Sequence, residues 1–96
     1  MARYRILYSS EYLDDYRSLE VFDRAKIRNA VLTLADQAEV LTRNRRRLRA
    51  TVSWCPDATW KLRVDDYRLF YRVESRTVFV LRVRFKGSGT IEEMGS

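Results

Sequence analysis

The chain has 96 residues, of which 46% are hydrophobic and 12% aromatic, so we expect one folded domain over residues 1–96 without metal or disulfide support. The length excludes a multidomain enzyme, and the apolar content excludes a disordered chain. No apolar run approaches the roughly 18 residues of a membrane span, no secretory signal precedes Tyr8, and the single Cys55 cannot form an internal disulfide. A cytoplasmic location is therefore expected.

The ionisable side chains narrow the chemistry further. The sequence contains no histidine, which excludes Ser-His-Asp triads, Cys-His pairs and histidine metal sites, and we expect neither a metal nor a cofactor. The net charge is +6, and sixteen of the 19 basic residues are arginines, because only Lys26, Lys61 and Lys86 are lysines. Arginine binds phosphate bidentately and stacks on bases, so this composition favours a polyanionic partner such as nucleic acid.

A strand followed by two helices is predicted in the first half of the chain. Residues 3–8 are rich in aliphatic and aromatic side chains, and Ser9 and Ser10 then provide a helix cap. A short helix is expected to run to Leu19. A longer amphipathic helix is predicted over about Val21–Leu41, because apolar residues recur there at spacings of three and four without glycine or proline.

The second half of the chain alternates with a period of two. After a connection over residues 42–59, three antiparallel strands are predicted over Trp60–Val64, Tyr67–Glu74 and residues 77–86. The predicted fold class is α+β, with two N-terminal helices packed on one face of a small, mostly antiparallel four-stranded sheet in the order β-α-α-β-β-β. Residues 87–96, which hold all three glycines, are expected to form a flexible tail.

Alternation also assigns each strand residue to one of two faces. An apolar face, which should pack on the helices, takes Trp60, Leu62, Val64, Tyr67, Leu69, Tyr71, Val73, Phe79, Leu81, Val83 and Phe85. The opposite face takes Phe70, Val78 and Val80 with seven cations, namely Lys61, Arg63, Arg68, Arg72, Arg82, Arg84 and Lys86. Like charges on neighbouring strands repel unless a polyanion or acidic groups compensate them, so we interpret this face as a binding surface for a phosphodiester chain.

Two alternatives remain open for these charges. The cationic face could simply be solvated, as the outer faces of antiparallel sheets often are. The arginines that precede the first strand of the meander could likewise be a solvated connection or an arm that follows phosphates, and they are Arg43, Arg45, Arg46, Arg47 and Arg49. On the RNA-binding interpretation, Phe70 or Tyr71 would contact bases.

The strand sequences resemble a known toxin family. The run from Trp60 to Val73, WKLRVDDYRLFYRV, with the later VFVLRV, resembles the RelE/ParE superfamily, the toxins of type II toxin–antitoxin modules. The resemblance extends over residues 3–86 and includes the arginine-rich segment 42–49. It implies a small α+β toxin whose sheet holds messenger RNA in the A site of the small ribosomal subunit, and a cognate antitoxin that wraps the toxin.

In the RNA-cleaving branch of this superfamily, basic residues of the central strands surround the scissile phosphate. The resemblance therefore implies catalytic roles for Lys61, Arg63, Arg68 and Lys86, with Arg84 competing for the place of Lys86. A Tyr or His near the C-terminus, which takes part in proton transfer in such toxins, has no counterpart here, because Gly-Ser-Gly-Thr-Ile-Glu-Glu-Met follows Lys86. Losing one acid–base group typically lowers a rate by about 10²–10⁴-fold.

Cleavage by the 2′-OH of the RNA requires a base as well as positive charge. Like charges around Lys61 should lower its pKa, so we predict that Lys61 is the base, with Tyr67 or Tyr71 as alternatives on the core face. The arginines Arg63, Arg68 and Arg84, or Lys86, would then stabilise the phosphorane.

Three functional hypotheses follow. The first is a RelE-type, ribosome-dependent endoribonuclease. The second is a ParE-type toxin that inhibits gyrase, or a degenerate toxin that only binds its antitoxin. The third is an RNA-binding module without toxicity. The partner expected for a toxin is an antitoxin with an amphipathic helix and acidic residues.

Overall fold

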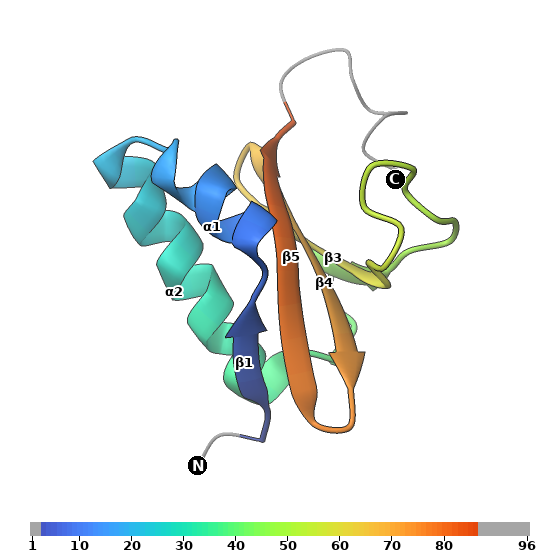
Figure 1. Ribbon diagram of the computed structural model, residues 1–96. Coiled ribbons are helices and arrows are strands. Elements are labelled where there is room, and N and C mark those ends of the chain that lie inside the picture. The colour runs from blue at the N-terminus through green and yellow to red at the C-terminus, as the bar shows by residue number, and fades with distance from the viewer. Residues whose placement is uncertain (1–2, 87–96) are drawn as a thin grey trace.

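In the computed structural model, which describes residues 3–86, two helices pack on one face of a sheet (Figure 1). The elements are β1 (Arg5–Tyr8), α1 (Ser10–Arg17), α2 (Val21–Gln37), β2 (Arg45–Arg47), β3 (Trp60–Val64), β4 (Tyr67–Glu74) and β5 (Thr77–Phe85). The predicted α+β class is confirmed. Neither helix of the described range combines the length and the apolar character that crossing a membrane requires. The tail expected over residues 87–96 lies outside the described residues.

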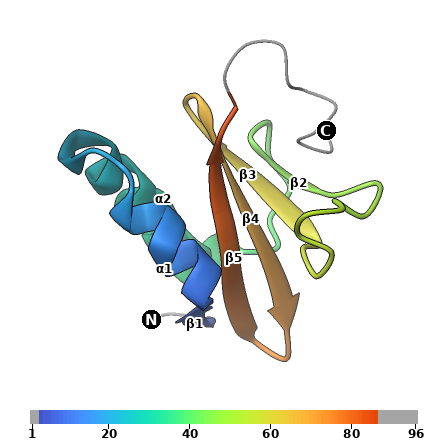
Figure 2. The same ribbon diagram turned by 45° about the horizontal axis from the view of Figure 1, so that its top comes forward.

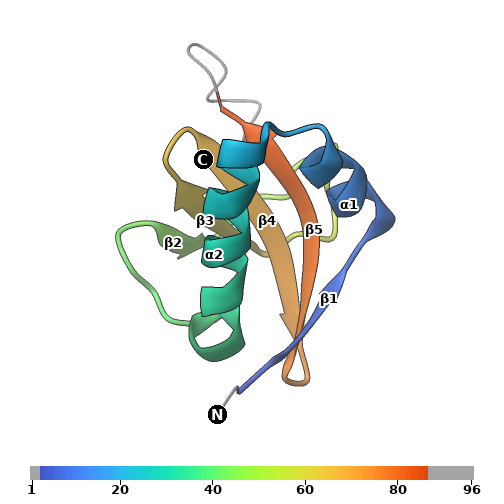
Figure 3. The ribbon, with the colours of Figure 1, turned by 90° about the vertical axis from the view of Figure 1, so that its left-hand side faces the viewer.

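The sheet has five strands in the order β1-β5-β4-β3-β2, so the predicted number of four was wrong. The additional strand is β2, which pairs antiparallel with β3 and so turns part of the expected connection into a sheet edge (Figure 3). The only parallel pair of the described sheet joins β1 to β5, whereas the two helices connect β1 to β2 at the other edge of the sheet. The three predicted strands of the meander, β3, β4 and β5, occupy the expected positions and order.

The long helix α2 ends at Gln37, four residues before the expected end at Leu41. Carbonyl groups just beyond this point are bound by other elements. The Ala38 carbonyl accepts a hydrogen bond from the Tyr71 hydroxyl at 2.6 Å, and the Val40 carbonyl accepts one from the guanidinium of Arg45 at 3.4 Å. These tertiary bonds replace the helical ones, which sequence periodicity alone does not reveal.

Apolar side chains pack on both faces of the sheet. The larger core lies between the sheet and the helices and is centred on Ile27, Leu34, Leu69 and Tyr71, none of which is exposed. The smaller cluster lies on the opposite, open face, where residues of the loop 48–59 cover part of the sheet (Figure 2). It consists of Val52, Cys55, Ala58 and Phe70, with Leu48, Trp54 and Leu81 packed around them.

A β-bulge in β5 changes the predicted faces. Phe70 pairs with Arg82 and Tyr71 pairs with Val80, which leaves Leu81 without a partner on β4. Because one extra residue reverses the alternation, Val80 and its neighbour Val78 are buried in the larger core, whereas Leu81 packs in the cluster of the open face. The predicted faces of Val78, Val80 and Leu81 were therefore wrong, and so was the predicted face of Phe79.

Candidate nucleic-acid interface

The open face carries cations side by side on four strands. Arg63, Arg68 and Arg84 are direct cross-strand partners on β3, β4 and β5. On the next row, Arg46 of β2 pairs with Lys61 of β3. With Lys86, which follows β5 and acts electrostatically on Lys61, these residues form what we call the open-face cluster: Arg46, Lys61, Arg63, Arg68, Arg84 and Lys86. The structure therefore brings together all four predicted catalytic residues.

The cations in the centre of this cluster form no ion pairs with carboxylates of the described residues. The ion pairs found in residues 3–86 join Arg17 to Asp14, Lys26 to Asp65, Arg72 to Glu74 and Arg82 to Asp15. Lys61, Arg63, Arg68 and Arg84 take part in none of them. Cross-strand cations at this spacing repel each other, so a bound polyanion would lower the energy of the cluster.

Lys61 has a pKa that this arrangement lowers. Its ammonium is half-buried, and this burial is the largest cause that lowers its pKa below the ordinary value of 10.5. The charges of Arg68, Arg46 and Lys86 lower the pKa further. The predicted direction is confirmed, with desolvation as the largest single cause and the three like charges acting in the same direction. A lowered pKa makes more of the neutral amine available to accept a proton.

Arg68 is almost fully buried, with 6% of its surface exposed. One terminal nitrogen donates hydrogen bonds to the backbone carbonyls of Asp65 at 3.2 Å and Tyr67 at 2.9 Å, which holds the guanidinium against the β3–β4 turn. Burial, and secondarily the charge of Arg63, lowers the pKa of Arg68. A cation that is fixed and poorly hydrated is suited to stabilise charge that develops on a phosphate.

Arg84 lies against an aromatic residue that the sequence analysis did not select. Its guanidinium carbon is 4.1 Å from the centre of the Trp54 ring, and the Nε atom is buried with no hydrogen-bond partner among the described residues. Trp54 in turn contacts Phe70 edge to face, with ring centres 5.0 Å apart. Arg84 therefore makes a cation–π contact with Trp54 that restrains its guanidinium. Trp54 is half-buried and lies next to Cys55 in a loop, where the sequence has no periodic pattern that could have identified it.

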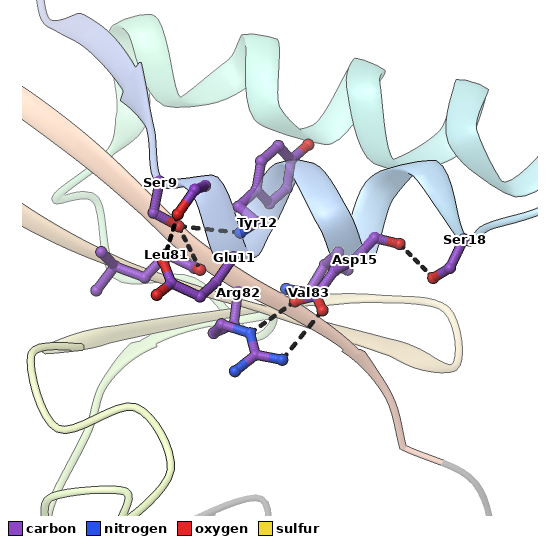
Figure 4. A network of polar contacts seen from close by, with 9 residues as sticks. Ser9, Glu11, Tyr12, Asp15, Ser18, Leu81, Arg82 and Val83 are labelled. Atoms are coloured by element: carbon purple, nitrogen blue, oxygen red, sulfur yellow. Dashed lines mark hydrogen bonds and ion pairs between the residues drawn. The ribbon is translucent and has the colours of Figure 1, made fainter.

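Arg82 was expected to bind RNA, but the structure pairs it with Asp15 of α1 (Figure 4). The Nε and a terminal nitrogen of Arg82 donate to the two carboxylate oxygens at 2.8 and 3.0 Å, and the Val83 amide donates to the same carboxylate at 3.1 Å. This carboxylate compensates the charge of Arg82, which ties β5 to α1 and leaves less positive charge for RNA than the prediction assumed. Asp15 is 67 residues away in the sequence, and no local pattern links the two.

Arg72 and Phe70 also differ from expectation. The Arg72 guanidinium donates to Glu74 at 2.8 Å and lies 4.4 Å from the centre of the Phe79 ring, so its charge is compensated within the sheet. Phe70 is fully buried under Trp54 and Cys55. Since a buried ring cannot stack on a base, the expected base contact of Phe70 was wrong.

The arginines of residues 43–49 do not form one continuous arm along the sheet. Arg45 is 4% exposed and points to the helix side, where it donates to the Thr33 hydroxyl at 3.3 Å. Arg47 also lies on that side, 5.5 Å from the centre of the Trp60 ring, and Arg49 is exposed in the loop after β2. Only Arg46 of this strand shares the face of Lys61, because neighbouring strand residues point in opposite directions.

The tyrosines considered as alternative bases are engaged on the core side. Burial raises the pKa of Tyr71, and burial together with the hydrogen bond to Asp23 raises the pKa of Tyr67 to about 12. Both are therefore poorly placed to take a proton on the open face. Within residues 3–86, no group of three or more acidic or cysteine side chains gathers to hold a metal ion.

Comparisons with known proteins bear on both the family and the fold of this chain. The sequence profile of the family described as ParE toxin of type II toxin–antitoxin system, parDE, matches residues 6–86. No curated protein sequence matches significantly.

Three solved structures illustrate the likeness in fold. A chain of the archaeal RelE–RelB complex from Pyrococcus horikoshii OT3 matches with a TM-score of 0.71 and 18% identity, covering 91% of this chain and 99% of that chain. A chain of the toxin–antitoxin complex RelBE2 from Mycobacterium tuberculosis matches with a TM-score of 0.71 and 22% identity, covering 86% and 98%. The isolated E. coli RelE toxin matches with a TM-score of 0.65 and 23% identity, covering 95% and 93%.

Proposed function

Because this chain belongs to the ParE toxin family of type II toxin–antitoxin systems, within the RelE/ParE superfamily, we propose that it is a cytoplasmic toxin that cleaves messenger RNA on the ribosome. The observation that carries this proposal is the open-face cluster, in which Lys61, Arg63, Arg68 and Arg84 lie on adjacent strands without carboxylate partners among residues 3–86. The fold would present this surface to a phosphodiester chain.

The proposed reaction uses the 2′-hydroxyl of the RNA itself. Lys61, as the neutral amine, removes the proton from the 2′-OH, and the oxygen attacks phosphorus. The new P–O2′ bond replaces the P–O5′ bond, and the leaving O5′ oxygen takes up a proton from solvent water, which gives a 2′,3′-cyclic phosphate and a 5′-hydroxyl end. Arg68 and Arg84 stabilise the negative charge of the phosphorane, and Arg63 and Lys86 bind at its edges.

A ribosome-programmed cleavage assay tests this function. We expect the wild-type protein to produce new 5′-hydroxyl ends in a messenger bound to ribosomes, and Lys61→Ala to reduce the cleavage rate by about 10²–10⁴-fold. Arg28→Ala is the matched control, because it removes one exposed cation from α2, on the helix side of the sheet. Unbroken messenger and normal growth after induction of the wild-type protein would contradict the proposal.

A second candidate is gyrase inhibition, which the resemblance implies for ParE-type toxins, and the matched family is described as ParE toxin. In this case the open-face cluster would be dispensable, and the toxin would act without breaking RNA. Inhibition of supercoiling by purified gyrase, with intact messenger in the ribosome assay, would reverse the order of the two candidates.

We also propose a cognate antitoxin as the partner. The structures from P. horikoshii and M. tuberculosis are toxin–antitoxin complexes, and a chain with a net charge of +6 is suited to an acidic partner. Expression with the neighbouring gene of its operon should yield a complex that protects bacteria from growth arrest.

A further inference from the structure

A small hollow adjoins the open-face cluster and plays no part in the proposed cleavage. Its volume is about 180 Å³, and it lies between the start of α1, the bulge of β5 and the loop 48–59. Its lining includes Trp54, Glu11, Asp57, Leu81 and Arg82. Sites for drug-sized ligands measure roughly 300–1,000 Å³, so this hollow suits a single planar ring system better than a whole nucleotide.

The lining combines an aromatic ring with acceptors. Trp54 is half-buried and held edge to face on Phe70, so it offers a rigid surface of the kind on which bases stack. Glu11 and Asp57 are exposed carboxylates at the rim. Carboxylates repel a phosphate group but accept hydrogen bonds from the amino group of a base. Arg82 also lines the hollow but is paired with Asp15, so the carboxylates of Glu11 and Asp57 make the hollow more acidic than the cluster beside it.

The cluster and the hollow meet at Trp54. Arg84, which belongs to the cluster, stacks on this ring at 4.1 Å, while the same residue lines the hollow. Arg82, the other cation near the ring at 5.9 Å, also lines the hollow, but its ion pair with Asp15 offsets its charge there. A nucleotide whose phosphate contacts Arg84 would therefore have its base directed towards the side that carries the carboxylates.

We propose that the hollow beside Trp54 binds one nucleobase with an exocyclic amino group, and thereby selects the sequence that is cleaved. This inference rests on the RNA-cleaving function proposed above. Uracil, which lacks an amino group, would be disfavoured, whereas cytosine, adenine and guanine can each donate to Glu11 or Asp57.

Binding of short RNAs tests the inference without cleavage. The probes are tetranucleotides with 2′-O-methyl groups, either all uridine or with one cytidine, adenosine or guanosine. We expect the substituted probes to bind the wild-type protein about five-fold or more tightly than the uridine tetramer. Glu11→Ala with Asp57→Ala should remove this preference. Asp36→Ala, which removes an exposed carboxylate of α2, should leave the preference unchanged.

The aromatic surface is tested separately from the carboxylates. Trp54→Ala should weaken binding of all the probes by roughly five- to 150-fold, and Trp54→Phe, which keeps a ring on Phe70, should restore most of the affinity.

Two outcomes would overturn the inference. Equal binding of all four tetramers by the wild-type protein, with normal cleavage on ribosomes, would remove base selection and leave the proposed function intact. Absence of both RNA binding and ribosome-dependent cleavage would remove the proposed function together with the inference.

Discussion

Arg45 and Arg46 are adjacent in the sequence but have opposite surroundings. Arg45 is buried on the helix side, and Arg46 is exposed beside Lys61. Arg45→Met should lower the free energy of unfolding by about 2–3 kcal/mol, because the hydrogen bonds to Thr33 and Val40 are lost, with no direct effect on RNA contacts. Arg46→Gln should change stability by less than about 0.5 kcal/mol and weaken RNA binding. Urea unfolding and RNA titration of both variants check this, and equal effects would contradict it.

Lys61 allows a prediction for the pH dependence of cleavage. Its pKa lies below 10.5, and the neutral amine is the form that accepts a proton, so the cleavage rate should rise with pH until that lowered pKa is passed. Lys61→Arg, which keeps the charge but stays protonated, should remove the rising limb and lower the rate by about 10²–10⁴-fold. Single-turnover rates across a pH series measure this.

Lys26→Arg is the matched control for the pH series, because Lys26 lies on α2 and pairs with Asp65. Its profile should follow that of the wild-type protein. If the rising limb persisted in Lys61→Arg, another group would remove the proton.

At the scale of elements, the junction between α1 and β5 is held at two points (Figure 4). The Ser9 hydroxyl oxygen accepts a hydrogen bond from the Tyr12 amide at 3.0 Å and donates one to the Leu81 carbonyl at 2.7 Å. Asp15, six residues further along the chain, accepts hydrogen bonds from Arg82 and Val83. Both sets of hydrogen bonds lie at the β-bulge of β5. They hold α1 against the position where the alternation of β5 side chains between the two faces of the sheet changes.

Removal of the Asp15 carboxylate should therefore destabilise the fold. Asp15→Ala leaves a partly buried guanidinium and an amide unpaired, and we expect a loss of about 2–4 kcal/mol in the free energy of unfolding. Thermal and urea unfolding measure it. Replacing both partners, in Asp15→Asn with Arg82→Gln, should cost less than the sum of the two single variants. Strict additivity would show that the two side chains do not interact.

At the scale of the whole molecule, net charge and its distribution have separable effects on the salt dependence of RNA binding. If four cations of the open-face cluster contact phosphates, the logarithm of the affinity for single-stranded RNA should fall with the logarithm of salt concentration with a slope of about −3. Arg84→Gln should reduce this slope by about 0.7. The double variant Asp15→Asn with Arg82→Gln removes a neutral pair and should leave the slope unchanged. Equal changes in both would contradict the assignment of the cationic surface.

Much of the molecule could be read from local patterns. Apolar spacing located both helices, and alternation with short turns located β3, β4 and β5, because burial of one side of an element repeats with the period of its backbone. The shared face of Lys61, Arg63, Arg68 and Arg84 followed from the same alternation, which holds wherever the strands pair without interruption.

The remaining features depended on distant residues. The bulge at Leu81 reversed the faces of Val78 and Val80, and the pairing of β2 with β3 divided the arginine run between the two sides of the sheet. Likewise, Asp15 neutralises Arg82 across 67 positions. A bulge, a strand pairing or an ion pair of this kind arises from contacts between elements. An alternating sequence is compatible with its presence and with its absence.

The sequence by itself thus determined that the chain is an α+β protein with a row of cations on one side of its sheet, since both properties follow from the period of the backbone. Only the tertiary structure decided which of these cations keep their charge available. Exposure and neutralisation depend on which side chains meet across the fold, and here Arg82 meets Asp15, Arg45 enters the core, and Lys61 and Arg84 stay together on the open face.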